Sequence, residues 1–387
     1  MENRQICQDD AILGQQTLLI AAMEKTVLIL GGTGRIGQSV ALDIINHTAA
    51  KIIITGRKEK AIKLLPRMQF LALDLEEIDK LRQAIKKSDL VIHCAGPFHY
   101  RDGRVVKICI EEKVNYIDVS DHRSFYQKLI PYRELAIKAG ITAVVNTGIF
   151  PGISNSIVRE GVEQLDRVET IRLNYAVAGS GGAGLTVMRT TFLGLKKPFL
   201  AWIEGKWQEI KPYTAREVID FPAPLGKTGV YWFDMPETYT FAESFPVQNV
   251  ITKFGSIPDF YNHLTWITAH IFPDAWVESS RGIEFFSQVS YRMTEVTDKF
   301  SGIGVAMLAK VAGWQGQQKA VYQATMVHEN TAQAAGWGTG SVAELILAAK
   351  LQKAGIYPVE QVLSTELFHA TMKKRGIKLD RSCAIVA

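Results

Sequence analysis

The stretch VLILGGTGRIGQSV, from Val27 to Val40, is the feature that most limits what this chain can fold into. Four apolar residues run into a cluster of glycines, and a segment with helical apolar spacing follows. The glycines match Gly32-x-Gly34-x-x-Gly37, which is a weak signal alone and a strong one between a strand and a helix. The stretch therefore predicts a strand, a tight turn and a helix whose N-terminus can hold phosphates.

The glycines of this loop have separate predicted tasks. Gly32 permits a sharp turn, Gly34 lets the backbone approach a pyrophosphate, and Gly37 lets the helix pack close to the strand. A glycine turn that binds no ligand is the alternative interpretation, and the flanking strand and helix favour a dinucleotide loop. The expected cofactor contacts from the loop are Gly32, Thr33, Gly34, Arg35, Ile36 and Gly37.

Short β-branched runs alternate with amphipathic segments from Lys25 to about Asn146. Near-continuous apolar strands separated by helices predict a doubly wound parallel sheet, a Rossmann fold, over residues 24–150. The predicted strands are TVLIL, KIIITG, QFLALDL, DLVIHCAG, NYIDVS and ITAVVN. The predicted helical segments are IGQSVALDIINH, KAIKLLP, IDKLRQAIKKS, RVVKICIEEK and SFYQKLIPYRELAIKAG.

The rest of the chain has a different pattern. Residues 151–325 begin with a predicted helix and a long strand, VETIRLNYAVAG, and then become rich in aromatic residues, which indicates a second, α+β domain. Residues 326–387 are predicted to be a helical segment that returns to the first domain. Residues 1–23 are expected to be a flexible and dispensable leader, unless translation begins at Met23.

The second predicted strand indicates which dinucleotide the loop holds. An NAD enzyme usually places Asp or Glu at the end of this strand to bind the ribose 2′-hydroxyl, but here Thr55 and Gly56 are followed by Arg57 and Lys58. A guanidinium offers charge and paired donors to a 2′-phosphate. Two solvated basic residues are the alternative, and NADP, used as NADPH, is the favoured cofactor.

Two further strand ends should contact the cofactor, because ligands lie outside the carboxyl ends of parallel strands. Asp74 closes the third strand and is expected to meet the adenine. Ala95, Gly96 and Pro97 follow the fourth strand and are expected beside the ribose and the nicotinamide.

Composition excludes several other classes of protein. The chain has 387 residues, 47% of them apolar and 21% charged, with a net charge of +5, as expected for a globular protein without a nucleic-acid partner. The densest basic run, Lys373-Lys374-Arg375, is interpreted as a solvated face. The four cysteines lack metal or disulfide spacing, which favours a reducing compartment, the cytoplasm, and predicts no metal site. No apolar stretch is long enough for a transmembrane segment.

Several motifs occur in the order seen in the saccharopine dehydrogenase-like (saccharopine reductase-like) oxidoreductases, which the chain resembles over about residues 24–165 and 320–378. The resemblance implies a Rossmann domain, a second domain for a small-molecule substrate and often for dimer contacts, and NAD(P)-linked reduction by a homodimer. The motifs are GGTGRIGQSVA, TGRK, VIHCAGPF, NYIDVSD, AGITAVVNTGIFPGISN and AAKLQKAGIYPVEQVL.

The chain departs from the lysine-pathway members of this family at two points. They have an acidic residue before Pro-Gly, where this chain has Phe150, and their Asn-Glu reads Asn146-Thr147 here. These departures therefore predict a substrate more apolar than saccharopine. Short-chain dehydrogenases are set aside, because no tyrosine here has Lys four residues later.

Residues that could move a proton lie near the predicted strand ends. Tyr100, Asp118 and His122 are the candidate catalytic residues, with Asp121 beside them. Asp118 could equally cap the following helix. His93 is assigned to the core with its neighbour Cys94.

A second glycine loop, AGSGGAGLTVMRTTF, could hold a substrate carboxylate or line the nicotinamide pocket, and a crowded turn is the alternative. The sequence predicts an NADPH-dependent reductase of a C=N, C=O or activated C=C bond. An NADP-binding scaffold or redox-sensing protein without turnover is the alternative.

Overall fold

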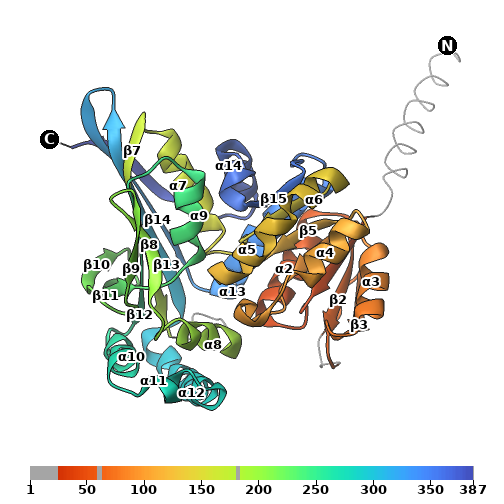
Figure 1. Cartoon of the computed structure of the whole chain (residues 1–387), viewed down its shortest axis with the longest axis horizontal. Helices are drawn as coiled ribbons and strands as arrows, with labels where there is room; N and C mark the ends of the chain where they lie inside the picture. Colours follow the sequence, from red (N-terminus) through yellow and green to blue (C-terminus); the bar gives the residue numbers. More distant parts are fainter. Residues whose placement is uncertain (1–24, 59–62, 180–183, 387) are drawn as a thin grey trace, which may run out of the picture.

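A computed structural model of the chain describes residues 25–58, 63–179 and 184–386. These residues form two lobes, each built on its own sheet (Figure 1). The predicted leader, residues 1–23, lies outside the described residues.

The first lobe is a parallel sheet of seven strands in the order β15-β6-β5-β4-β1-β2-β3. Its order reverses between β1 and β4, and this is the point at which doubly wound sheets bind ligands. The predicted Rossmann fold is confirmed. The strands are β1 (Thr26–Leu30), β2 (Lys51–Gly56), β3 (Met68–Ala72), β4 (Leu90–His93), β5 (Asn115–Asp118), β6 (Thr142–Val145) and β15 (Gly355–Pro358).

Helices connect these strands largely where the sequence predicted them. Pro131 interrupts the predicted helix SFYQKLIPYRELAIKAG, which is two helices joined by a 3-10 turn at Ile130–Tyr132. The predicted helix KAIKLLP is not found in its described part, because residues 63–65 form no helix. The helices are α2 (Arg35–His47), α3 (Ile78–Lys86), α4 (Arg104–Glu111), α5 (Arg123–Leu129) and α6 (Arg133–Ala139), with a 3-10 turn η1 (Phe98–Tyr100) after β4.

The second lobe holds a mixed sheet in the order β10-β11-β12-β7-β13-β14-β16, in which the long β7 pairs parallel with β12 and antiparallel with β13. The predicted second α+β domain is confirmed. Its strands are β7 (Arg167–Ala178), β10 (Glu217–Phe221), β11 (Gly226–Trp232), β12 (Asn249–Ile257), β13 (Gly304–Gln315), β14 (Gln318–His328) and β16 (Asp380–Ile385), with a hairpin of β8 (Phe199–Ile203) and β9 (Lys206–Ile210). Its helices are α7 (Ile153–Glu163), α8 (Leu185–Leu193), α9 (Pro236–Ser244), α10 (Phe260–His270), α11 (Asp274–Val277) and α12 (Ser280–Ser301).

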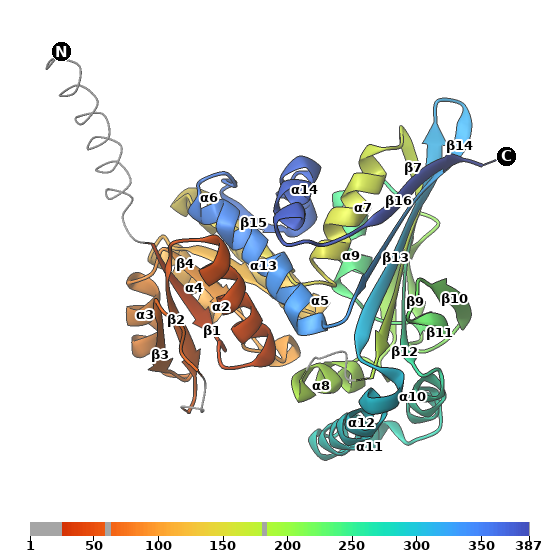
Figure 2. The same cartoon turned by 180° about the vertical axis from the view of Figure 1, so that it is seen from behind.

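The C-terminal segment ties the two lobes together. Helix α13 (Thr331–Leu347) runs along α2 so closely that a Cβ added to Gly336 would lie 2.7 Å from the backbone of Ser39 (Figure 2). The predicted return of C-terminal helices to the first domain is therefore confirmed, and α14 (Thr365–Lys374) follows. The segment is not only helical, because it also supplies β15 to the first sheet and β16 to the second.

The prediction that the basic run Lys373-Lys374-Arg375 is solvated is wrong for Arg375. Its side chain is fully buried and bonds Asp43 of α2 through three contacts of 2.6 to 3.1 Å and Glu344 of α13 at 2.9 Å. Charge patterning cannot distinguish this arginine from its exposed neighbours, because its partners lie far away in the sequence. The ion pair joins the last described helix to the first.

No helix within residues 25–58, 63–179 and 184–386 is both long and apolar enough to cross a bilayer.

Candidate functional site

The glycine loop after β1 is shaped by close backbone contacts. Gly31 has a φ of +74°, and a Cβ there would lie 2.8 Å from the Cα of Ala95. The residue in the left-handed conformation is thus Gly31 and not Gly32. Gly32 instead packs closely on β2, because a Cβ added to it would lie 2.6 Å from the side chain of Ile54. A Cβ on Gly37 would lie 2.5 Å from the Gly31 carbonyl oxygen, so Gly37 allows the helix to approach the turn closely, as predicted.

The loop presents the start of α2 to a ligand. The N-cap residue is Gly34, which has no side chain to satisfy the first backbone N–H groups of the helix. The loop is fixed from the side, because Thr33 N–H donates to the Thr55 carbonyl at 3.3 Å and Gln38 donates to the Thr33 carbonyl at 3.0 Å. A fixed turn with an uncapped helix start fits the pyrophosphate of a dinucleotide.

The end of β2 is basic. Arg57 and Lys58 directly follow the strand and are both exposed. A third cation, Arg101, donates to the Ala95 carbonyl at 2.7 Å. Burial lowers the Arg101 pKa, and the positive charge of Arg57 lowers it further. Sequence reasoning missed Arg101, since it follows η1 and only the parallel sheet brings the ends of β2 and β4 together.

Asp74 lies at the end of β3 and faces the same basic group. Its carboxylate accepts from the backbone N–H of Glu76 at 3.1 Å, and its negative charge partly offsets the lowering of the Arg101 pKa. This position, next to the end of β2, is where an adenosine would lie.

The ends of β4 and β5 face helix α8 of the second lobe. A Cβ added to Gly96 would lie 3.5 Å from the Thr186 methyl group. One helical turn further along α8, Thr190 lies close enough to Asp121, which follows β5, to lower the pKa of its carboxyl. Thr186 and Thr190 share one face of α8, so this helix runs over both strand ends. The second glycine loop leads into α8, but residues 180–183 lie outside the described residues.

Asp121, beneath α8, is a buried carboxyl with an unpartnered oxygen. Among the described residues nothing hydrogen-bonds its buried Oδ1 atom. Burial raises the pKa of Asp121 to about 6, against a lowering effect of the nearby Thr190.

Asp118 is the last residue of β5 and is fully buried. Its Oδ1 accepts from the backbone N–H and hydroxyl of Ser120, at 3.0 and 2.6 Å, and from the N–H of Asn146 at 3.0 Å. These bonds join the loops after β5 and β6. Asp118 does not cap α5; the N-cap residue is His122, which accepts from the Ser124 N–H.

Tyr100 belongs to η1 after β4, and His122 lies at the start of α5 after β5. His122 Nε2 lies 3.3 Å from His99 Nδ1, and burial, with the neighbouring cations, lowers the His122 pKa to about 4. Tyr100 is 60% exposed and lines a small cavity with Glu76 and Arg101, on the side of β3. His93 is in the core, as predicted, where burial lowers its pKa to about 3.

Residues 27–144 match the family described as the saccharopine dehydrogenase NADP binding domain. The predicted resemblance is confirmed. The glycine loop, the uncapped start of α2 and the basic end of β2 all lie within the residues that match this NADP-binding domain.

The relatives of the chain support the same assignment. A carboxynorspermidine synthase from Vibrio alginolyticus is 25% identical over 230 residues, which are 55% of each protein. A saccharopine dehydrogenase-like oxidoreductase from Rattus norvegicus is 24% identical over 183 residues, 42% of this chain and 43% of that protein. The chain thus spans about half the length of the curated relatives it matches.

A solved structure extends the likeness of fold to both lobes. Saccharopine dehydrogenase (L-Glu forming) from Saccharomyces cerevisiae matches with a TM-score of 0.63, over 93% of this chain and all of that chain, at 13% identity. The second lobe therefore has the arrangement found in that enzyme.

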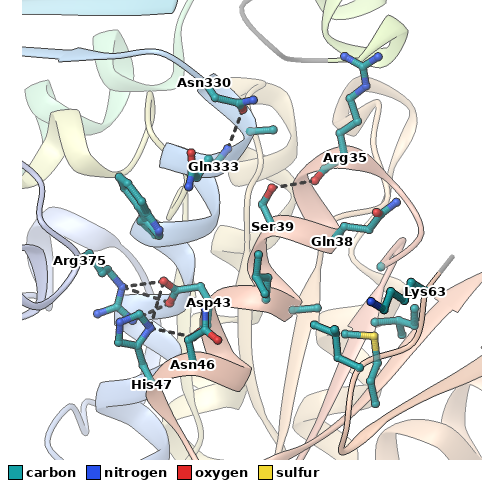
Figure 3. A pocket seen from close by; sticks show the side chains of 18 of the residues that line it. Arg35, Gln38, Ser39, Asp43, Asn46, His47, Lys63, Asn330, Gln333 and Arg375 are labelled. Atoms are coloured by element: carbon teal, nitrogen blue, oxygen red, sulfur yellow. Dashed lines mark hydrogen bonds and ion pairs between the residues drawn. The ribbon is translucent and has the colours of Figure 1, made fainter.

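A large cavity of about 1040 Å³ lies along α2 and reaches the glycine loop at the end of β1, where Gly32 and Arg35 line it (Figure 3). It is bounded by the outer side of α2, by residues of α12 and by the start of α13, with Asp43 and Arg375 on one wall. Arg35 reaches from its edge to the second lobe, where it donates to the Tyr291 hydroxyl at 2.6 Å. The ends of β4 and β5 beneath α8 remain the better place for a hydride acceptor, because ligands of parallel sheets bind outside the carboxyl ends of the strands.

Proposed function

We propose that this protein is an NADPH-dependent reductase of a C=N, C=O or activated C=C bond in a small, relatively apolar molecule. The observation that carries the proposal is that α8 of the second lobe covers the ends of β4 and β5, beside Gly96 and Asp121. The cofactor, when bound, supplies a hydride. The loop from Gly32 to Gly37 would hold its pyrophosphate, Arg57 and Lys58 its 2′-phosphate, Asp74 its adenine side, and residues 95–97 its nicotinamide side.

The chain's own groups would then orient the acceptor and supply a proton. Asp121 fits the task better than Asp118 or His122, because it lies beneath α8 with an unpartnered carboxyl oxygen and is protonated below a pKa of about 6. Asp118 would position the β5 and β6 loops. His122, whose lowered pKa keeps it neutral near pH 7, would hold the start of α5.

The apolar character of the substrate is supported by the residues around Pro151. Phe150 stacks on Tyr175 with ring centroids 4.3 Å apart, and Thr147 donates its hydroxyl to the Asp118 carbonyl at 2.8 Å. Neither side chain offers a charge to an α-amino group.

The proposed reaction is tested with two substrate panels. The protein is mixed with NADPH and either amino-acid imines or apolar enones and enoyl compounds, and loss of NADPH absorbance is followed. We expect turnover with the apolar panel. Turnover confined to the amino-acid panel would refute the apolar substrate, and turnover with neither would favour a cofactor-binding protein without catalysis.

Replacing Arg57 by Ala tests the cofactor preference. We expect NADPH to bind about tenfold or more weakly and NADH to be unaffected, because a charge-assisted bond to the 2′-phosphate contributes about 1.5–3 kcal/mol. Fluorescence titration of both cofactors measures this, with Lys51→Ala at the other end of β2 as the control. An equal loss for the two cofactors would remove Arg57 from 2′-phosphate recognition.

A further inference from the structure

The side chain of Arg35 joins the glycine loop to the second lobe. Arg35 is the first residue of α2 and directly follows the N-cap residue Gly34. Its Nη2 atom donates to the hydroxyl of Tyr291, in α12, at 2.6 Å, and its guanidinium carbon lies 5.7 Å from the centre of the Tyr291 ring. A residue of the expected cofactor loop is therefore held by a residue more than 250 positions later in the sequence.

The Arg35 side chain extends past the N-terminal end of its own helix. Figure 3 shows it pointing away from Asn46 and His47, which lie at the other end of α2. Arg35 and Tyr291 line the same cavity as Gly32 of the loop, so the space between them opens onto the turn. The pyrophosphate of a dinucleotide is expected at this end of the helix, within reach of a long side chain that starts there.

The second lobe contacts this side chain at two places. The Tyr291 hydroxyl bonds its end. Gly184, the N-cap residue of α8, approaches its stem, because a Cβ added to Gly184 would lie 3.7 Å from the Arg35 Cδ atom. The direction of the Arg35 side chain therefore depends on elements of the second lobe.

The group that Tyr291 offers to Arg35 is uncharged. A carboxylate at this place would form an ion pair with the guanidinium and compete with a phosphate for it. A hydroxyl fixes the direction of the guanidinium without cancelling its charge, and the aromatic ring adds a cation–π contact. Tyr291 thus orients Arg35 without reducing its attraction for a phosphate.

Helix α12, which carries Tyr291, also fixes α8. Arg189 of α8 donates to both carboxylate oxygens of Glu284 in α12, at 2.7 and 2.8 Å. Phe192 of α8 stacks on Phe286 of α12 with ring centroids 5.6 Å apart. Because α8 covers the ends of β4 and β5, these two helices link the glycine loop to the place proposed for the hydride acceptor.

We propose that Tyr291 is a positioning residue of the cofactor site, which holds the Arg35 guanidinium at the pyrophosphate of NADPH. The inference rests on the proposed function for the identity of the ligand. The first lobe supplies the charge and the second lobe orients it, so the cofactor is bound most tightly when α12 lies against the loop. The pyrophosphate occurs in NADPH and NADH alike, whereas Arg57 and Lys58 are proposed to bind the 2′-phosphate of NADPH alone.

Replacing Tyr291 by Phe removes the hydroxyl and keeps the ring. Calorimetric titration of the full chain at one ionic strength gives the Kd of NADPH, of NADH and of adenosine 2′-monophosphate, which carries a 2′-phosphate and no pyrophosphate. We expect NADPH and NADH to bind about threefold to tenfold more weakly, and adenosine 2′-monophosphate to stay within about twofold. A general disturbance of the lobes would affect all three ligands. An equal loss for adenosine 2′-monophosphate, or a loss confined to NADPH, would overturn the proposal.

Tyr261→Phe is the matched control. It removes another tyrosine hydroxyl that contacts α12, where it lies 2.8 Å from the Thr297 hydroxyl, in a bond that does not involve Arg35. We expect this variant to bind both cofactors within about twofold of the unmutated chain. A loss as large as that in Tyr291→Phe would show that any disturbance of α12 has the same effect, and would overturn the specific role of Tyr291.

A double-mutant cycle tests whether Tyr291 acts through Arg35. Arg35→Ala should weaken the binding of both cofactors about tenfold or more, and adding Tyr291→Phe should cause no further loss beyond about 1.5-fold, because the hydroxyl then has no guanidinium to hold. Additive losses would overturn the positioning role. If the unmutated chain binds neither cofactor, the proposed function fails and this inference with it; if it binds NADPH and Tyr291→Phe binds equally well, this inference alone fails.

Discussion

Replacement of Arg375 by Met is expected to lower the free energy of unfolding by about 3–5 kcal/mol, because it leaves the Asp43 carboxylate buried without its partner. Asp43 is 2% exposed, and Arg375 makes three contacts with it. Urea denaturation followed by circular dichroism measures the loss.

The neighbouring Lys374 is the control for this prediction. It bonds Glu344 from an exposed position, so Lys374→Met should cost less than about 1 kcal/mol. Adding Asp43→Asn to Arg375→Met should restore part of the stability, because the unpaired charge is removed. Equal effects of the two single variants would show that burial of the ion pair does not matter.

Replacement of Gly37 by Ala is expected to weaken NADPH binding by about tenfold to a hundredfold. The added Cβ would lie 2.5 Å from the Gly31 carbonyl oxygen and 2.7 Å from the Gly32 Cα, both backbone atoms, so α2 must move away from the turn. The N–H groups at the start of α2 would then no longer point at the pyrophosphate. Each charge-assisted hydrogen bond that is lost weakens binding by about 1.5–3 kcal/mol. Fluorescence titration with NADPH measures the change.

Leu42→Ala, on the outer side of the same helix, controls for general loss of helix stability. Leu42 is 46% exposed, so its truncation should leave the NADPH affinity within about twofold. Unchanged NADPH affinity in Gly37→Ala would show that the close packing of α2 on the glycine turn is not needed for binding.

Local sequence patterns were enough to predict the NADP-binding domain. The observed bounds of β1 and β2 coincide with the runs TVLIL and KIIITG, because buried parallel strands are continuous apolar runs that end at glycine or polar residues. The strand–turn–helix order likewise placed the phosphate loop. The sharp turn was predicted at Gly32, one residue after its observed position at Gly31. Two adjacent glycines in a sequence do not show which of them has the left-handed backbone conformation.

Features that depend on distant parts of the chain could not be predicted. Strand β15 has only four residues, GIYP, and becomes a strand because β6 offers it an edge. Arg375 is buried because Asp43, more than 300 residues earlier, is opposite it. Asp121 was named beside the candidate acids, but only α8, from the other lobe, distinguishes it from Asp118.

The central claim, that this chain uses NADPH, is tested most directly by titrating the unmutated protein with NADPH and with NADH under one buffer and one ionic strength. The account predicts that NADPH binds at least about tenfold more tightly, through its 2′-phosphate at Arg57 and Lys58. Equal affinity for the two cofactors, or binding of neither, would contradict it.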